Sequence, residues 1–102
     1  MATKQEIKKA LENWQGNLKY WEKDLEHTKE VVAGLKKSIT FVQQSLKGTG
    51  PAAYGTRSDQ KKSVYWMKKN LEEWNKILKN KKEMVARAKE KVRFYKSELK
   101  KA

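Results

Sequence analysis

The sequence predicts an all-α protein, an antiparallel two-helix coiled-coil hairpin that dimerises into a four-helix bundle. Three observations predict this fold: two long heptad ladders, a single short loop between them, and a second apolar stripe. In each ladder apolar residues recur at alternating steps of three and four, which keeps one seam on one side of a helix. The first ladder is Ile7, Leu11, Trp14, Leu18, Trp21, Leu25, Thr28, Val32, Leu35, Ile39, Val42 and Leu46. The second is Val64, Met67, Leu71, Trp74, Leu78, Lys81, Val85, Ala88, Val92, Tyr95 and Leu99.

The first helix is expected over about residues 4–47. Thr3 and Glu6 have the spacing of a capping box, in which each side chain meets a free backbone N–H at the helix start. The first ladder then continues without a break for about six heptads. The helix is expected to end at Lys47, before the helix-breaking residues Gly48, Gly50 and Pro51.

A loop is expected over residues 48–58, followed by a second helix over about 59–100. The loop segment is the only Gly/Pro-rich stretch of the chain. Ser58 or Asp59 is the expected N-cap of the second helix, because both side chains can accept a hydrogen bond from the first helical turn. With 102 residues and one pair of ladders, the chain is expected to form a single helical-hairpin domain over residues 1–102.

The two ladders can be aligned with each other. In an antiparallel pair the residue numbers of facing core positions share a constant sum, and a sum near 106 places bulky residues opposite smaller ones, such as Trp14 opposite Val92. Two rungs join a polar to an apolar residue: Thr28 faces Leu78, and Lys81 faces Leu25. These two rungs lie near the middle of the ladders.

A second apolar stripe lies beside the seam on both helices, at positions that carry no lysine on the first helix. Soluble monomers seldom expose this much apolar surface, so the stripe predicts a homodimer or a partner interface. Gly34 fits a close approach of another backbone, since an interior glycine weakens a helix by about 1 kcal/mol. The predicted interface residues are Tyr20, Val31, Gly34, Phe41, Trp66, Ile77, Met84 and Phe94.

The opposite edge is basic. The formal net charge is +13, and residues 52–102 carry +10 of it, from 16 Lys and Arg against six acids. Such a surface attracts nucleic acid or an acidic protein, or it serves only as a solvated face that keeps the chain soluble. Lysine dominates, which suits contact with phosphates irrespective of sequence. The predicted polyanion-binding residues are Lys36, Lys68, Lys79, Lys82, Lys89, Arg93 and Lys96.

No catalytic, cofactor-binding or metal-binding motif stands out. The chain has no cysteine and one histidine, His27, so a histidine-based catalytic set or a metal cluster would need residues from elsewhere. We therefore expect no enzyme activity, no cofactor, no metal and no small-molecule substrate. No apolar run is long enough to span a membrane and no signal segment is recognisable, so a cytoplasmic location is expected.

Two functions follow as hypotheses. The first is a non-enzymatic oligomeric module whose basic edge binds a polyanion, nucleic acid without strong sequence preference. The alternative is a protein-interaction or assembly module, such as a viral or bacterial accessory factor, that docks a partner through the second apolar stripe.

Overall fold

A computed structural model describes residues 2–50 and 52–102, and these residues form two long helices that pack against each other. Helix α1 spans Lys4–Lys47 and helix α2 spans Arg57–Lys101. No strand occurs within the described residues. The predicted all-helical hairpin is therefore confirmed, whereas Pro51, expected to help end the first helix, lies outside the described residues.

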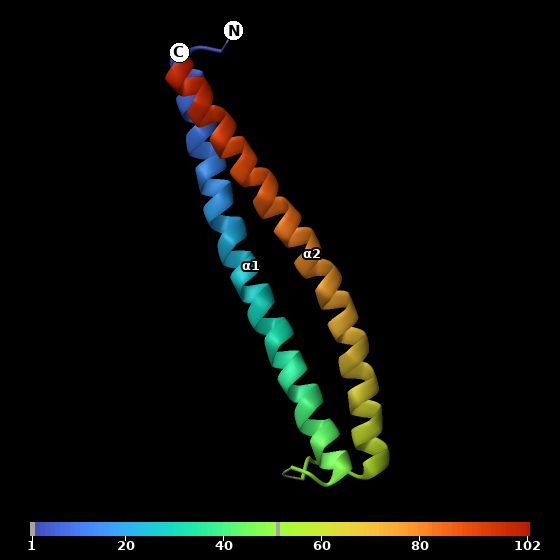
Figure 1. The fold of residues 1–102 in the computed structure, drawn as a ribbon. Helices are drawn as coiled ribbons and strands as arrows, with labels where there is room; N and C mark the ends of the chain where they lie inside the picture. The colour runs from blue at the N-terminus through green and yellow to red at the C-terminus, as the bar shows by residue number, and fades with distance from the viewer. Residues whose placement is uncertain (1, 51) are drawn as a thin grey trace. The chain divides into compact units, whose positions relative to one another are not determined.

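The chain divides into two compact units, each containing a part of both helices. The terminal unit comprises the residues up to His27 together with Lys79–Ala102, and the loop unit comprises Thr28–Leu78. In the terminal unit the blue start of α1 lies beside the red end of α2 (Figure 1). In the loop unit the green end of α1 and the yellow start of α2 are joined by the loop (Figure 1).

The seam is where the ladders predicted it. Every residue of both ladders is buried or half-buried, including the bulky Trp14, Trp21 and Trp74. Seven apolar side chains form the most buried part of the core, and all seven belong to the ladders: Ile7, Val32, Ile39, Val64, Val85, Ala88 and Val92. Thr28, one of the two polar ladder residues, is fully buried.

Both ends of α1 are closed by local hydrogen bonds. At its start the backbone N–H of Glu6 donates to the hydroxyl of Thr3 at 3.2 Å, as the capping-box spacing predicted. At its end Gly48 has a φ of +74°, and the N–H groups of Gly48 and Thr49 donate to the carbonyls of Ser45 and Gln44. This Schellman arrangement places glycine where other residues would be strained.

Helix α2 begins at Arg57, two residues before the expected start at Asp59. The expected N-cap at Ser58 or Asp59 is wrong, because Thr56 takes that role: the Asp59 N–H donates to the Thr56 hydroxyl at 3.2 Å. The Thr56 N–H in turn donates to the Asp59 carboxylate at 3.2 Å. Asp59 is therefore the second half of a capping box, the same device that starts α1.

The loop is held to the helices through Gln60. This side chain is buried, and its amide N–H groups donate to the carbonyls of Ala53 and Gly55, both at 3.1 Å. Its carbonyl oxygen accepts from the Ser45 hydroxyl at 3.2 Å, and Ser45 accepts from the Ala53 N–H at 2.8 Å. Gln60 lies one step before Val64 and extends the second ladder with a polar residue.

Lys81, the charged member of the second ladder, has a carboxylate beside it. Its ammonium lies 2.8 Å from the carboxylate of Asp24, and the two side chains are only 20% and 27% exposed. Asp24 directly precedes Leu25, the residue that the alignment places opposite Lys81. The ion pair therefore agrees with the alignment in which the numbers of facing residues sum to about 106. It gives Lys81 a partner of opposite charge next to the leucine that it faces.

Candidate functional site

A basic stripe runs along α2 in the terminal unit. Its residues follow one another at steps of three or four, so they lie on one side of the helix. Six of its seven positions are basic and the seventh is Ala86. The basic stripe comprises Lys79, Lys82, Ala86, Lys89, Arg93, Lys96 and Lys100.

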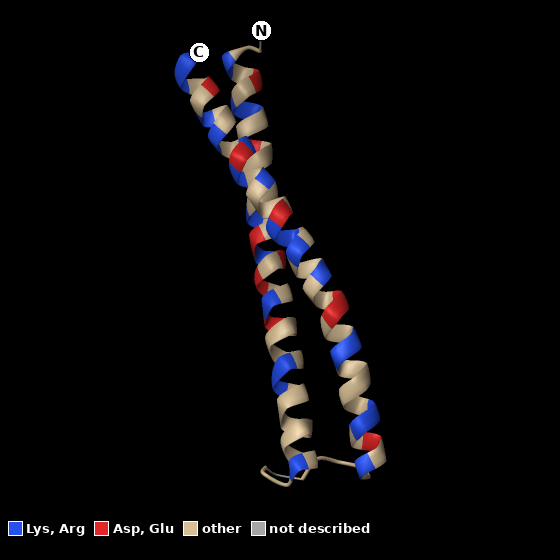
Figure 2. Ribbon diagram, turned by 45° about the vertical axis from the view of Figure 1, so that its right-hand side comes forward, with Lys and Arg blue, Asp and Glu red and all other residues tan. Residues whose placement is uncertain are grey.

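The six basic side chains of this stripe are all exposed. None of them lies within 4.0 Å of a carboxylate of the described chain. Among the described residues, two ion pairs involve this part of α2, Lys81 with Asp24 and Lys101 with Glu98 at 3.7 Å, and no residue of either pair belongs to the stripe. Figure 2 shows basic residues spread along α2, with acidic residues at intervals among them. The stripe thus presents uncompensated positive charge to solvent.

The predicted polyanion-binding residues fall in both units. Lys79, Lys82, Lys89, Arg93 and Lys96 lie on the basic stripe of the terminal unit. Lys36 and Lys68 are exposed residues of the loop unit. Lys100, which the prediction left out, continues the stripe by one further step.

The second apolar stripe is exposed, as its prediction as an interface requires. Trp66 is 61% exposed, Tyr20 65%, Phe94 53% and Phe41 43%. Ile77 and Met84 are also exposed, Val31 is half-buried, and Gly34 is exposed. No atom of another element lies within 4 Å of where a Cβ on Gly34 would be, so the close approach expected there is not made by this chain itself.

Five of these eight residues belong to the loop unit: Val31, Gly34, Phe41, Trp66 and Ile77. The ten positions of this apolar face in the loop unit include one charged residue, Glu73; the others are Val31, Gly34, Ser38, Phe41, Ser45, Ser63, Trp66, Asn70 and Ile77. In the terminal unit the corresponding positions of α2 include Arg87 and Lys91 between Met84 and Phe94. The apolar face is therefore nearly free of charge in the loop unit, where its apolar residues alternate with small polar ones, and it is interrupted by charge in the terminal unit.

Tyr65 is a further exposed aromatic that the predicted site did not include. It is 53% exposed, and the ammonium of Lys69 lies 5.0 Å from the centre of its ring. Such a cation–π contact at an exposed site is worth about 0.5–1 kcal/mol. The two residues are four apart in the sequence, a spacing that places their side chains next to each other on a helix and could have predicted this contact.

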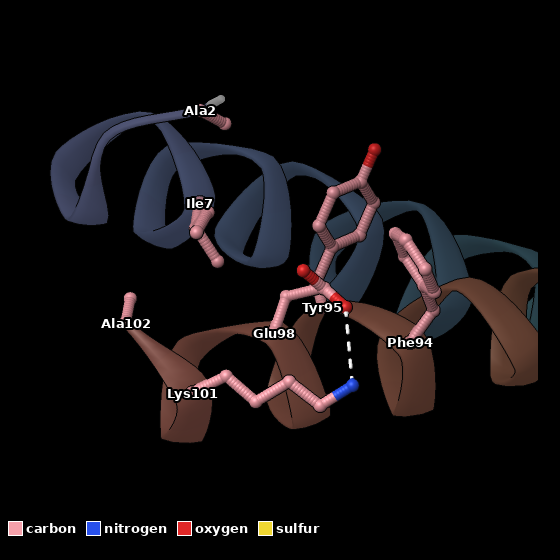
Figure 3. Close-up of a pocket in the computed structure, with 7 residues that line it drawn as sticks. All are labelled: Ala2, Ile7, Phe94, Tyr95, Glu98, Lys101 and Ala102. Atoms are coloured by element: carbon pink, nitrogen blue, oxygen red, sulfur yellow. Dashed lines mark ion pairs between the residues drawn. The ribbon is translucent and has the colours of Figure 1, made fainter.

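A hollow of about 440 Å³ lies at the chain ends of the terminal unit. Figure 3 shows Ile7 from α1 and Tyr95 from α2 reaching toward the opposite helix, with Phe94 beside Tyr95. Its polar side chains besides Tyr95 are Glu98 and Lys101, which form the ion pair drawn there.

No group of three or more His, Cys, Asp or Glu side chains within residues 2–50 and 52–102 is placed to hold a metal ion. Over the same residues, neither helix contains a stretch long and apolar enough to cross a bilayer.

Neither protein-family models, curated proteins nor solved structures give a significant match to this chain. The functional assignment therefore depends on the chain's own residues and surfaces.

Proposed function

We propose that the chain is a non-enzymatic helical module that binds a polyanion, nucleic acid without strong sequence preference, through the basic stripe of the terminal unit. One observation carries the proposal: six of seven successive positions on one side of α2 are basic, exposed and without a carboxylate partner. Lysines in such a row neutralise phosphates and release their counterions, which drives binding without reading bases.

The free helix is destabilised by this arrangement. Four pairs of stripe residues carry like charges at i, i+3 or i, i+4: Lys79 with Lys82, Lys89 with Arg93, Arg93 with Lys96, and Lys96 with Lys100. Each such pair destabilises a helix by about 0.2–0.5 kcal/mol. A bound polyanion relieves this repulsion, so the same charges that weaken the free helix favour the complex.

A matched pair of variants tests the proposal. Lys82→Glu/Lys89→Glu/Lys96→Glu reverses three stripe residues spaced by seven, and Lys62→Glu/Lys69→Glu/Lys76→Glu reverses three exposed lysines with the same spacing on the outer side of α2. Both lower the net charge equally. We expect the first variant to lose the mobility shift of a nucleic-acid probe at about 50 mM salt, where phosphate contacts are strong, and the second to keep it.

Two outcomes contradict the proposal. If both variants lose binding equally, total charge and not the stripe determines it. If the unaltered chain gives no complex at this salt concentration, the stripe binds no nucleic acid.

We propose a second property, self-association into a four-helix bundle through the apolar face of the loop unit. The partner is a second copy, because two strongly basic chains repel each other everywhere except at a face nearly free of charge, and this face has one charged residue in ten. The exposed Trp66 and Phe41 supply the large side chains that anchor such interfaces.

Two glycines allow a controlled test of the dimer. Gly34 lies on the apolar face and Gly16 on the outer side of α1, and both have open space where a Cβ would go. Either Gly→Ala change should stabilise the helix by up to about 1 kcal/mol. Only Gly34→Ala should weaken self-association measured by light scattering, and Trp66→Glu should abolish it. A chain that stays monomeric at millimolar concentration refutes the dimer.

A further inference from the structure

We infer that the nucleic acid bound by the basic stripe is double-stranded and is held by its phosphates. This inference rests on the proposed polyanion binding and specifies its ligand. From Lys79 to Lys100 the stripe is about 31 Å long, at 1.5 Å per residue. A duplex presents one phosphate charge per about 1.7 Å of its axis along that whole length. A row of cations along a straight helix therefore matches a ligand whose phosphates are held at a regular density along a straight axis.

The stripe lacks what single strands require. Single-stranded nucleic acid binds to platforms of aromatic side chains on which its bases stack. No stripe position is aromatic. The exposed aromatic of this part of α2 is Phe94, which packs edge-on against Tyr95 at 5.1 Å and lies roughly 115° around the helix from the middle of the stripe, at 3.6 residues per turn. Unstacked bases would find lysine stems, the Arg93 guanidinium and the Ala86 methyl group, but no aromatic ring.

The chemistry of the stripe also favours phosphates over base edges. Five of its six cations are lysines, which act as point charges and do not form the two-pronged contact by which arginine reads guanine. Two packed helices are together about 20 Å wide, whereas the major groove of DNA is about 12 Å wide. The pair therefore lies over the phosphate ridges that border a groove, and binding has no strong sequence preference.

An anionic membrane surface fits the stripe less well. Helices that lie in a bilayer interface bury a broad apolar face beside their cations. The stripe offers Ala86 alone for this purpose, because Val85 and Val92 of the same helix segment are buried in the seam and the exposed Met84 and Phe94 lie away from the stripe. Contact with lipid would depend on charge only.

The test measures binding of the full chain by fluorescence anisotropy to three probes: a 20-base-pair duplex, one of its strands, and vesicles containing 30% phosphatidylserine. We expect the duplex to bind at least tenfold more tightly than the single strand at equal phosphate concentration. The logarithm of the duplex affinity should fall with that of salt concentration with a slope of about −5, for six phosphate contacts.

Each result decides a different question. Equal or tighter binding of the single strand, or tighter binding of the vesicles, overturns the duplex assignment and leaves polyanion binding intact. Failure of all three probes to bind overturns the proposed function itself.

The variant Ala86→Trp tests the reason for the preference. It places an exposed aromatic in the middle of the stripe without changing its charge. We expect it to raise affinity for the single strand by about fivefold or more, as base stacking does, and to leave duplex affinity within twofold. Unchanged affinity for the single strand contradicts the role assigned to the missing aromatics.

Discussion

The two units use the same position of the seam in chemically different ways. Lys81 in the terminal unit and Gln60 in the loop unit lie three heptads apart on α2. Each contacts the α1 residue that precedes the leucine facing it in the alignment. Lys81 contacts Asp24, which precedes Leu25, and Gln60 contacts Ser45, which precedes Leu46. The first contact is an ion pair between half-buried charges, and the second belongs to a network of neutral hydrogen bonds that also holds the loop.

The outer surfaces differ in arrangement more than in amount of charge. The terminal unit has 15 basic and eight acidic residues, a net +7, and the loop unit has ten and four, a net +6. In the terminal unit the cations occupy successive steps of one stripe, whereas in the loop unit they are separated by uncharged or acidic residues such as Tyr65 and Glu72. The two units thus have nearly equal net charge, but the terminal unit has a basic stripe and the loop unit has an apolar face.

The largest expected effect on stability concerns the ion pair. Asp24→Ala removes the carboxylate 2.8 Å from the half-buried Lys81 ammonium. Because breaking a buried pair leaves a charge poorly solvated, we expect a loss of about 2–3 kcal/mol in unfolding free energy. Urea denaturation measures this loss, and Glu26→Ala, at an exposed position of the same helix, is the control.

A second change shows whether the loss arises from the charge. In the background of Asp24→Ala, Lys81→Met replaces the ammonium by an apolar side chain of similar length and should recover most of the lost stability. No recovery would mean that Asp24 stabilises the terminal unit by some other contact.

The neutral network of the loop unit is expected to matter somewhat less. Gln60→Leu removes three hydrogen bonds and leaves the carbonyls of Ala53 and Gly55 without these donors. We expect a loss of about 1–2 kcal/mol, and this loss should change little between 0.05 and 0.5 M salt because no charge is involved. Gln15→Leu at an exposed site should change stability by less than about 0.5 kcal/mol. An equal effect of the two substitutions would contradict the role of the network.

The smallest expected effect on stability lies at the end of α1. Gly48→Ala places a Cβ at a φ of +74°, which side chains of L-residues disfavour by about 1 kcal/mol. Thermal denaturation should show a corresponding loss, whereas Gly16→Ala, in the helix interior, should show a gain. A gain at both positions would mean that the Schellman turn is not maintained in solution.

The ladders could be read from the sequence because heptad spacing determines which side chains face the other helix. The same reasoning missed the partner of Lys81, although the position of Asp24 next to Leu25 places it within reach of Lys81. It also placed the start of α2 too late, because Thr56 and Asp59 have capping-box spacing that was overlooked in a loop rich in other candidate caps. Periodicity identifies faces well, but contacts between residues that flank the seam depend on side-chain length and direction.

The candidate surfaces were predictable to a similar degree. Exposure of the apolar stripe follows from the same periodicity, and the structure agrees for Trp66, Phe41, Tyr20 and Phe94. Its concentration in the loop unit depends on where the chain divides into two units, and that boundary, at Thr28 and Leu78, coincides with one of the two polar rungs near the middle of the ladders. The basic stripe lies in one of these units, and the nearly charge-free part of the apolar face lies in the other.

The central claim is that arrangement of charge, and not its total, determines polyanion binding. The most direct test compares Lys82→Gln/Lys89→Gln/Lys96→Gln with Lys62→Gln/Lys69→Gln/Lys76→Gln in duplex binding between 50 and 200 mM salt. Each phosphate contact contributes about −0.9 to the slope of log affinity against log salt. We predict that the stripe variant reduces the magnitude of the slope by about 2.7, for three lost contacts, and that the control leaves it unchanged. Equal slopes for the two variants would contradict the account.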